Sequence, residues 1–201
     1  MGLLSTSTHF VRYAVEGELP ADFWNFAAEH IAHAAFRDID DNYEERSLGW
    51  VSVDNMFDSA FAGASFAIAD YLVLALRIDE RKVAPSVLKK FCLKEEEKIK
   101  KEHEIPRLSR RQRVEIKENV RLALLKKSLP TAAVYDLCWN LAQGSLFFFS
   151  TNTKVHEVLE SLFKETFGLH LVMQIPFLAA THLLNEMEQQ QLADLRPDIF
   201  I

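Results

Sequence analysis

The sequence predicts an α+β fold in which helices pack on a mainly antiparallel sheet and a basic helical hairpin projects from it. Three observations support this. Segments rich in β-branched and aromatic residues alternate with amphipathic segments of helical period. The strand segments are grouped with few crossovers, and the basic residues gather in one stretch of the chain. With 201 residues, 49% hydrophobic and 26% charged, the chain can bury a core without disulfides or metal.

The first part of the chain is expected to contain a strand, a helix and two further strands. Phe23, Ala27 and Ile31 recur with helical period, which predicts the helix. The last of the strands contains an uninterrupted apolar run, residues 71–76. The expected elements are a strand over 3–15, a helix over 20–36, a charged loop over 38–46, and strands over 48–53 and 66–78.

Two basic helices are expected next. Pro85 suits the first turn of a helix, which is expected to run to about residue 102. Ser109 and Gln112 have the spacing of a capping box, which predicts the start of a second helix that ends near Lys127. We therefore expect a single α+β domain over 1–201, in which a helical hairpin arm at 84–128, the basic arm, is inserted between two sheet-forming halves.

The second half is expected to form a β-hairpin, a helix, a strand and a last helix. Leu129-Pro130 separates it from the basic arm. Gly144 lies in the turn of the β-hairpin, Asn152 or Thr153 caps the next helix, and Gly168 ends it. The expected elements are strands over 134–141 and 145–149, a helix that starts at 153 or 154 and ends before Gly168, a strand over 169–175 and a helix over about 177–192.

The charge of the chain is unevenly distributed. Its net charge is −6, yet the stretch from Arg77 to Ser128 holds 17 Lys and Arg against 9 Asp and Glu and therefore carries +8. The remainder carries −14, from 6 basic and 20 acidic residues. A concentrated basic segment on an acidic body indicates a polyanionic partner.

The basic residues of the two expected helices form one stripe on each helix. The spacing keeps each stripe within about 80° of the helix surface, which suits contact with successive phosphates. A solvated helical pair is the alternative, supported by pairs such as Glu97 with Lys101. No aromatic residue interleaves the stripes, so neither single-strand stacking nor sequence readout is indicated. The candidate DNA contacts are Lys90, Lys94, Lys98, Lys101, Arg110, Arg113, Lys117 and Arg121, with the adjoining Arg77, Arg81 and Lys82.

Catalytic and metal-binding patterns are weak. The sequence has no GxSxG, Walker A, GxGxxG or CxxC motif. Asp38, Asp40 and Asn42 begin like a calcium loop, but Gly49 stands where the bidentate Glu belongs, so an exposed acidic loop is expected. His30 and His33 lack a third ligand in register. We therefore expect neither an enzyme nor a cofactor or metal.

Several stretches of the sequence resemble the recombination-associated RdgC family of bacterial DNA-binding proteins. The resemblance spans roughly residues 3–175. It is carried by Phe36–Asp41, Leu48–Val51, Leu76–Pro85 with the helix after it, Lys127–Pro130, Tyr135-Asp136, and the stretch from Ser150–Lys154 through Phe167–Leu169. The resemblance implies a non-enzymatic, ring-shaped dimer that binds duplex DNA in a positively charged hole and restrains the strand-exchange recombinase. It also implies that helical projections help to close the ring.

The chain departs from the family's pattern in two places. Familiar members continue into a further C-terminal domain, whereas this chain ends at Ile201 after one expected helix. Some members also carry an aromatic residue soon after the Leu-Pro that follows the second helix, where this chain has Thr131-Ala132-Ala133. These departures bear on ring closure and on any wedge inserted into DNA.

The leading prediction is a sequence-independent, duplex-DNA-binding homodimer connected with recombination or replication. We expect it in the cytoplasm on the nucleoid, without a membrane segment. Contact with the strand-exchange recombinase is what the resemblance implies. A module that binds an acidic protein through the basic arm is the alternative. A metal-dependent nuclease is the least favoured, since Asp70, Asp79, Asp136 and Glu157 show no convergence in the sequence.

Overall fold

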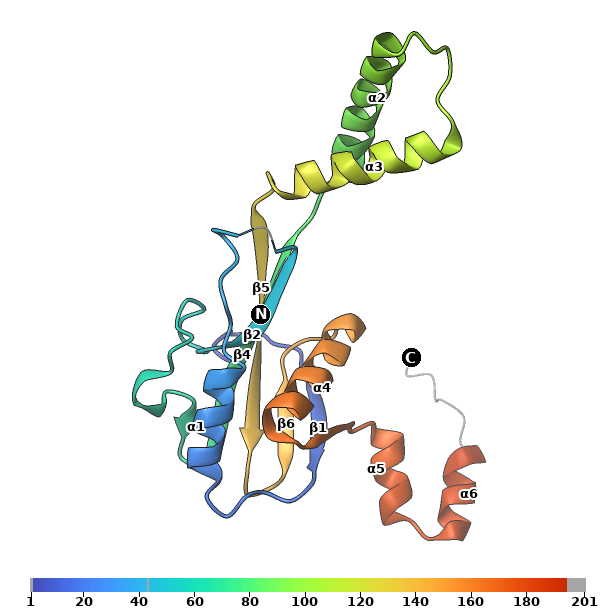
Figure 1. The fold of residues 1–201 in the computed structure, drawn as a ribbon. Coiled ribbons are helices and arrows are strands. Elements are labelled where there is room, and N and C mark those ends of the chain that lie inside the picture. The colour runs from blue at the N-terminus through green and yellow to red at the C-terminus, as the bar shows by residue number, and fades with distance from the viewer. Residues whose placement is uncertain (1, 43, 195–201) are drawn as a thin grey trace.

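The structure, a computed structural model, describes residues 2–42 and 44–194, apart from the side chains of residues 178, 179, 181, 182 and 193. Within these residues seven strands form one antiparallel sheet in the order β2-β4-β5-β6-β1-β7, and β3 pairs with β4 beside this path (Figure 1). The predicted α+β class with a mainly antiparallel sheet is confirmed. The strands are β1 (Val11–Glu16), β2 (Arg46–Val51), β3 (Ala67–Ile68), β4 (Tyr71–Arg81), β5 (Pro130–Asn140), β6 (Ser145–Phe148) and β7 (His170–Met173). The helices are α1 (Phe23–His33), α2 (Pro85–Glu102), α3 (Arg110–Leu125), α4 (Thr153–Phe167), α5 (Pro176–Leu183) and α6 (Glu186–Asp194).

Helices α1 and α4 cover one face of the sheet and enclose the main core. Ile31 of α1, Leu74 of β4 and Phe163 of α4 belong to one cluster of fully buried side chains. Trp50 and Trp139 lie in the same cluster, as their positions on strands predict. Burial of these large apolar side chains supplies the main driving force for folding of the body, which is the described part of the chain outside 84–128.

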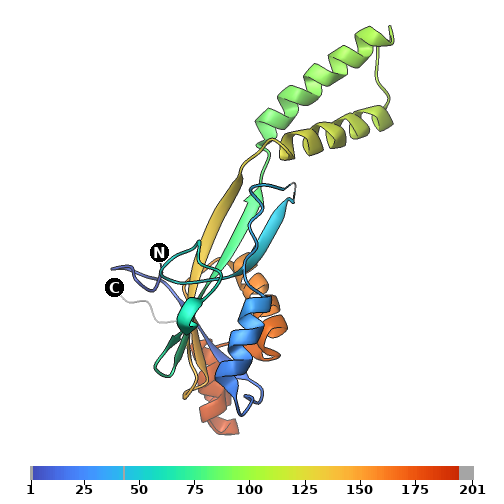
Figure 2. The same ribbon diagram turned by 60° about the vertical axis from the view of Figure 1, so that its left-hand side comes forward.

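Strands β4 and β5 carry the basic arm away from the body. They pair over their whole eleven-residue length, from Tyr71 opposite Asn140 to Arg81 opposite Pro130. Eleven residues of antiparallel strand span about 36 Å. The far halves of the two strands extend beyond α1 and α4, and the basic arm stands at their end (Figures 1 and 2).

The basic arm consists of α2 and α3, which start where the local signals predict. Pro85 occupies the first turn of α2. The capping box of α3 is complete: the Ser109 hydroxyl accepts from the Gln112 N–H at 3.2 Å, and the Gln112 side chain accepts from the Ser109 N–H at 2.9 Å. The two helices lie close together at the base of the arm and diverge toward the connection at its tip (Figure 2).

Two strand predictions in the first half differ from the structure. The strand expected over 3–15 begins only at Val11, because the preceding segment is held by a side chain: the Leu3 N–H donates to the Asp136 carboxylate at 2.8 Å. Burial raises the pKa of this carboxyl group. The strand expected over 66–78 is interrupted at Ala69, whose φ of 51° forms a turn between β3 and β4.

Two boundaries in the second half also differ from expectation. Strand β5 begins at Pro130, four residues before the expected start, because it pairs with the whole of β4. The single helix expected over 177–192 is two helices, α5 and α6. Asn185 starts the second of these, because its side chain accepts from the Glu188 N–H at 3.0 Å and the Glu188 carboxylate accepts from the Asn185 N–H at 3.0 Å.

Candidate nucleic-acid interface

The basic arm presents a set of exposed cations that its own carboxylates leave unpaired. Both predicted stripes lie on helices, as expected. Within the described residues, six members of the stripes form no ion pair, so their charge is available to a ligand. These are Lys90, Lys94, Lys101, Arg110, Arg113 and Lys117, all exposed to solvent.

Other cations of the predicted set are partly neutralised. Lys98 lies 3.6 Å from Glu95 and 3.9 Å from Glu102, and Lys82 lies 2.7 Å from Glu80. These pairs are exposed, and such pairs contribute only about 0–1 kcal/mol. The expected pairing of Glu97 with Lys101 is replaced by an ion pair of Glu97 with Lys100 at 3.3 Å. Part of the basic arm therefore does behave as a solvated helical pair.

A groove between α2 and α3 brings cations of both helices together. It has a volume of about 480 Å³, and its lining includes the apolar side chains of Leu88 and Val114. Arg113 and Lys117 of α3 line it together with Lys89 and Glu96 of α2. Lys89 was absent from the predicted set, because it lies one position off the α2 stripe and its place in the groove depends on how the two helices pack.

Arg77 is buried in the body and does not reach the surface where a phosphate would bind. Its guanidinium donates to both carboxylate oxygens of Asp79, at 2.8 and 2.7 Å, and to the Met56 carbonyl at 3.1 Å. The Phe36 ring lies 4.1 Å from the guanidinium carbon. Hydrogen bonding to Asp79 is the main cause that raises the pKa of Arg77. The structure thus gives this predicted contact an internal role.

Arg81 is also buried, and it organises the junction between the basic arm and the body. Its guanidinium donates to the carbonyls of Ile39 at 2.7 Å, Asn42 at 3.0 Å and Glu44 at 3.2 Å, and also to that of Ser128 at the end of the arm. The described residues of the acidic loop (38–42, 44 and 45) therefore curl around this side chain. We take Arg81 to be a positioning residue for the arm and not a phosphate contact.

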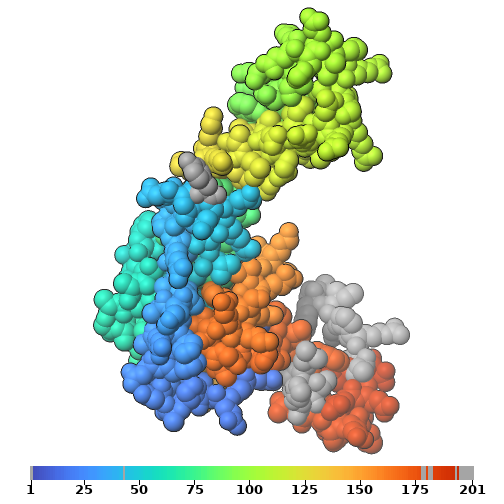
Figure 3. Space-filling view, viewed as in Figure 1, coloured from blue at the N-terminus to red at the C-terminus, as the bar shows by residue number. Residues whose placement is uncertain are grey.

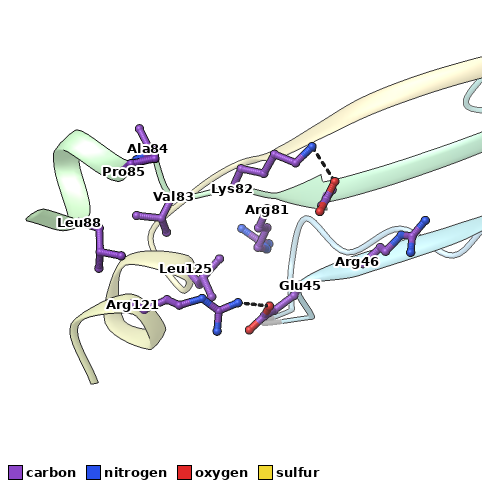
Figure 4. Close-up of a pocket in the computed structure, with 11 residues that line it drawn as sticks. Glu45, Arg46, Arg81, Lys82, Val83, Ala84, Pro85, Leu88, Arg121 and Leu125 are labelled. Atoms are coloured by element: carbon purple, nitrogen blue, oxygen red, sulfur yellow. Dashed lines mark hydrogen bonds and ion pairs between the residues drawn. The ribbon is translucent and has the colours of Figure 1, made fainter. Parts of the chain in front are cut away.

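Arg121 connects α3 to the acidic loop at the base of the arm. It lies 3.1 Å from Glu45 and 3.3 Å from Glu118. Figure 4 shows this ion pair at the edge of a cavity of about 660 Å³, which Arg46 and Lys82 also line. A phosphate that approached Arg121 would have to compete with Glu45 for it.

Replacing Arg81 by lysine is expected to lower the free energy of unfolding by about 2 kcal/mol, because a lysine offers three donors on one atom and cannot bond carbonyls on several sides. Arg121→Lys is the matched control, since its partners are exposed carboxylates, and it should cost less than about 1 kcal/mol. Urea unfolding followed by tryptophan fluorescence measures both. Equal losses for the two variants would contradict a special role of Arg81.

The acidic loop and the histidines of α1 show no metal-binding geometry. Among the residues that the structure describes, no group of three or more His, Cys, Asp or Glu side chains is arranged to hold a metal ion. The carboxylates of the acidic loop are exposed, as predicted. His30 and His33 each bond a carbonyl one turn earlier in α1, at 2.9 and 2.8 Å. No helix in the described ranges is long and apolar enough to cross a membrane.

The comparisons with known proteins point to the same family as the sequence resemblance. The chain matches the family model described as "Putative exonuclease, RdgC" over residues 11–186. The comparison with curated proteins gives no match. The matched range starts at β1, includes the whole basic arm and ends at the first residue of α6. Because this range covers most of the chain, the protein belongs to the recombination-associated RdgC family.

Proposed function

We propose that this protein binds duplex DNA without sequence preference, acts in recombination or replication on the nucleoid in the cytoplasm, and modulates the strand-exchange recombinase without being an enzyme. The observation that carries the proposal is the set of six exposed, unpaired cations on the basic arm. Membership of the recombination-associated family supports it.

The position of the basic arm removes an electrostatic objection to this proposal. The chain as a whole carries −6 and the part outside 77–128 carries −14, which would repel DNA at close range. At physiological salt, however, charges are screened over about 8 Å. Strands β4 and β5 are about 36 Å long and place the arm well beyond that distance from most of the body. The local charge of the arm can then attract a duplex.

A salt titration of DNA binding tests the proposal. If about four phosphates are contacted, the slope of log K against log salt should be about −3.6 for each chain. Duplexes of equal length and unrelated sequence should give the same slope and the same affinity. A protein that fails to bind any duplex at low salt would contradict the proposal.

A second candidate function is the binding of an acidic protein partner by the basic arm. It is favoured by apolar side chains that the arm exposes among its cations, including Phe91 (40% exposed), Leu93 (54%) and Val114 (63%). Apolar surface of this kind is typical of protein interfaces. This candidate would be favoured if the protein bound no DNA and its basic arm bound an acidic peptide.

We further propose that the protein is a two-fold dimer, joined through α5 and α6. Leu183 and Met187 are 87% and 72% exposed on these helices, and the pair projects from the body (Figure 1). The basic arms are less suited to the contact, because residues 84–128 hold 14 Lys and Arg against 7 Glu, and two copies at +7 would repel each other. Sedimentation should show a dimer at tens of micromolar and a monomer for Leu183→Asp with Met187→Asp. A monomeric unmodified protein would contradict the dimer.

We expect no cleavage of linear or circular duplex DNA by this protein with Mg²⁺ or Mn²⁺. The sequence shows no motif that pairs a catalytic nucleophile with a general base. It also shows no complete set of metal-binding carboxylates. The measurement is a gel assay of stringently purified protein with end-labelled and supercoiled DNA. Cleavage that disappears on replacing Asp38 and Asp40 would overturn the expectation and favour a nuclease.

A further inference from the structure

A cleft on the body, next to the basic arm, is lined by Arg46 and Lys154, which are not among the candidate DNA contacts, and by Lys82, which is. It has a volume of about 710 Å³ and lies between the first turn of α4 and the far halves of β2, β4 and β5. Arg46 comes from β2, Lys82 follows β4, and Lys154 comes from α4. These side chains are distant in the sequence and meet only because the sheet places them together.

The concentration of charge in this cleft is unusual for the body. Outside 77–128 the chain has 20 acidic but only 6 basic residues, and two of those six, Arg46 and Lys154, line this one cleft. Both are exposed, and neither forms an ion pair in the described part of the chain. Glu80 in the same cleft is already paired with Lys82 at 2.7 Å. An anion would therefore meet two free cations here, opposed only by Glu157.

Neutral donors complete the lining. The hydroxyl groups of Thr131 and Tyr135 belong to the cleft, and both residues lie on the far half of β5. Neither forms a side-chain hydrogen bond to another described residue, so both hydroxyl groups are available as donors. Asn152 adds a side-chain amide, of which the oxygen accepts from the Lys154 N–H at 3.1 Å and the NH₂ group stays available. The cleft thus offers both charge and hydrogen-bond donors, which a phosphate oxygen requires.

The cleft is continuous with the base of the basic arm. It shares Arg46, Glu80 and Lys82 with the cavity that Arg121 lines. Together they form a trough from α4 along β4 and β5 to α3. Figure 3 shows the hollow on this side of the molecule, between the overhanging arm and α4. A rod bound to the underside of the arm would run into this trough.

We infer that the cleft holds a phosphate group of the duplex that the basic arm binds, with Arg46 and Lys154 as its contacts. This inference rests on the proposed DNA binding and adds a second contact region, on the body. The duplex is then held at two places, the arm and α4, which fixes its direction relative to the sheet. Contacts on the arm alone would hold the duplex only at the arm and leave its path along the body unconstrained.

The test compares two double variants that remove the same charge. Arg46→Ala with Lys154→Ala removes the two cations of the cleft. Arg12→Ala with Lys164→Ala removes one arginine and one lysine from the body elsewhere, on β1 and on the same helix α4. Binding of a 30-base-pair duplex is measured over a series of salt concentrations. Loss of this one phosphate contact should make the slope less negative by about 0.9 and weaken binding about 8-fold at 0.1 M salt, whereas the control should match the unmodified protein.

The outcomes separate this inference from the proposed function. If the unmodified protein binds no duplex, the proposed function fails. If it binds and the cleft variant behaves like the control, DNA binding stands and the inference is overturned. Inorganic phosphate at constant ionic strength is the second probe. In one outcome, inorganic phosphate no longer weakens DNA binding by the cleft variant, while the variant's DNA affinity is unchanged. The cleft would then be a small-anion site, and the inference would be overturned.

Discussion

Replacing Lys90, Lys94, Arg113 and Lys117 by glutamate is expected to abolish measurable DNA binding at physiological salt. All four are exposed and form no ion pair in the described part of the chain. They come from both helices of the basic arm. If each meets one phosphate, their loss removes about 0.9 log units of affinity per contact at 0.1 M salt, or roughly 4000-fold in total. The introduced carboxylates add repulsion to this loss.

Two controls separate the contacts of the basic arm from a general change of charge. A variant with glutamine at the same four positions loses the contacts without adding repulsion. It should therefore show most of the loss of DNA affinity. Replacing Arg12, Arg37 and Lys164 by glutamate changes the net charge by −6, compared with −8 for the arm variant. It leaves the arm intact, so DNA affinity should change little. Fluorescence anisotropy with a labelled duplex measures all three variants. Unchanged affinity of the arm variant at low salt would remove the arm from the DNA model.

The elements that could be predicted from the sequence are those with local signals. Pro85 and the Ser109–Gln112 capping box fix the starts of α2 and α3 through contacts within four residues. The strand over 3–15 failed for the opposite reason. An apolar pattern does not distinguish a paired strand from a segment held by a distant side chain, and Leu3 is held by Asp136, 133 positions later. The division of the expected helix over 177–192 at Asn185 is a local feature. The spacing of Asn185 and Glu188, which bond each other at the start of α6, could have predicted it.

The same distinction between local and long-range signals applies to the residues of the candidate site. The arm stripes follow from helical period alone, and the structure places all eight of these residues on helices. The residues of the cleft come from four separate elements, so no spacing in the sequence brings Arg46 and Lys154 together. Arg77 and Arg81 were predicted as DNA contacts, but the structure buries both, and the sequence contained a sign of this. Alternation along β4 puts Arg77, Asp79 and Arg81 on one face and Lys82 on the other, which pairs Arg77 with Asp79.

Replacing Asp79 by alanine is expected to lower the free energy of unfolding by about 3–5 kcal/mol, because it leaves the Arg77 guanidinium buried without its main partner. Both side chains are at least 94% buried, and the ion pair measures 2.7 Å. Asp38, 3.8 Å from Arg77 and half exposed, is too distant and too solvated to replace it. For a chain of this size each kcal/mol lowers Tm by about 2–4 °C.

A double variant, Arg77→Met with Asp79→Leu, shows whether the loss comes from an uncompensated charge. Apolar side chains of similar volume can replace a buried ion pair at little cost. We therefore expect the double variant to be more stable than Asp79→Ala alone in urea unfolding. The same double variant also tests the role of Arg77 in DNA binding. If Arg77 is internal, the double variant keeps the unmodified salt slope, because no phosphate contact is lost. A slope that is less negative by about 0.9 in a well-folded double variant would mean that Arg77 reaches a phosphate after all, and would return it to the interface that its place in the sequence first indicated.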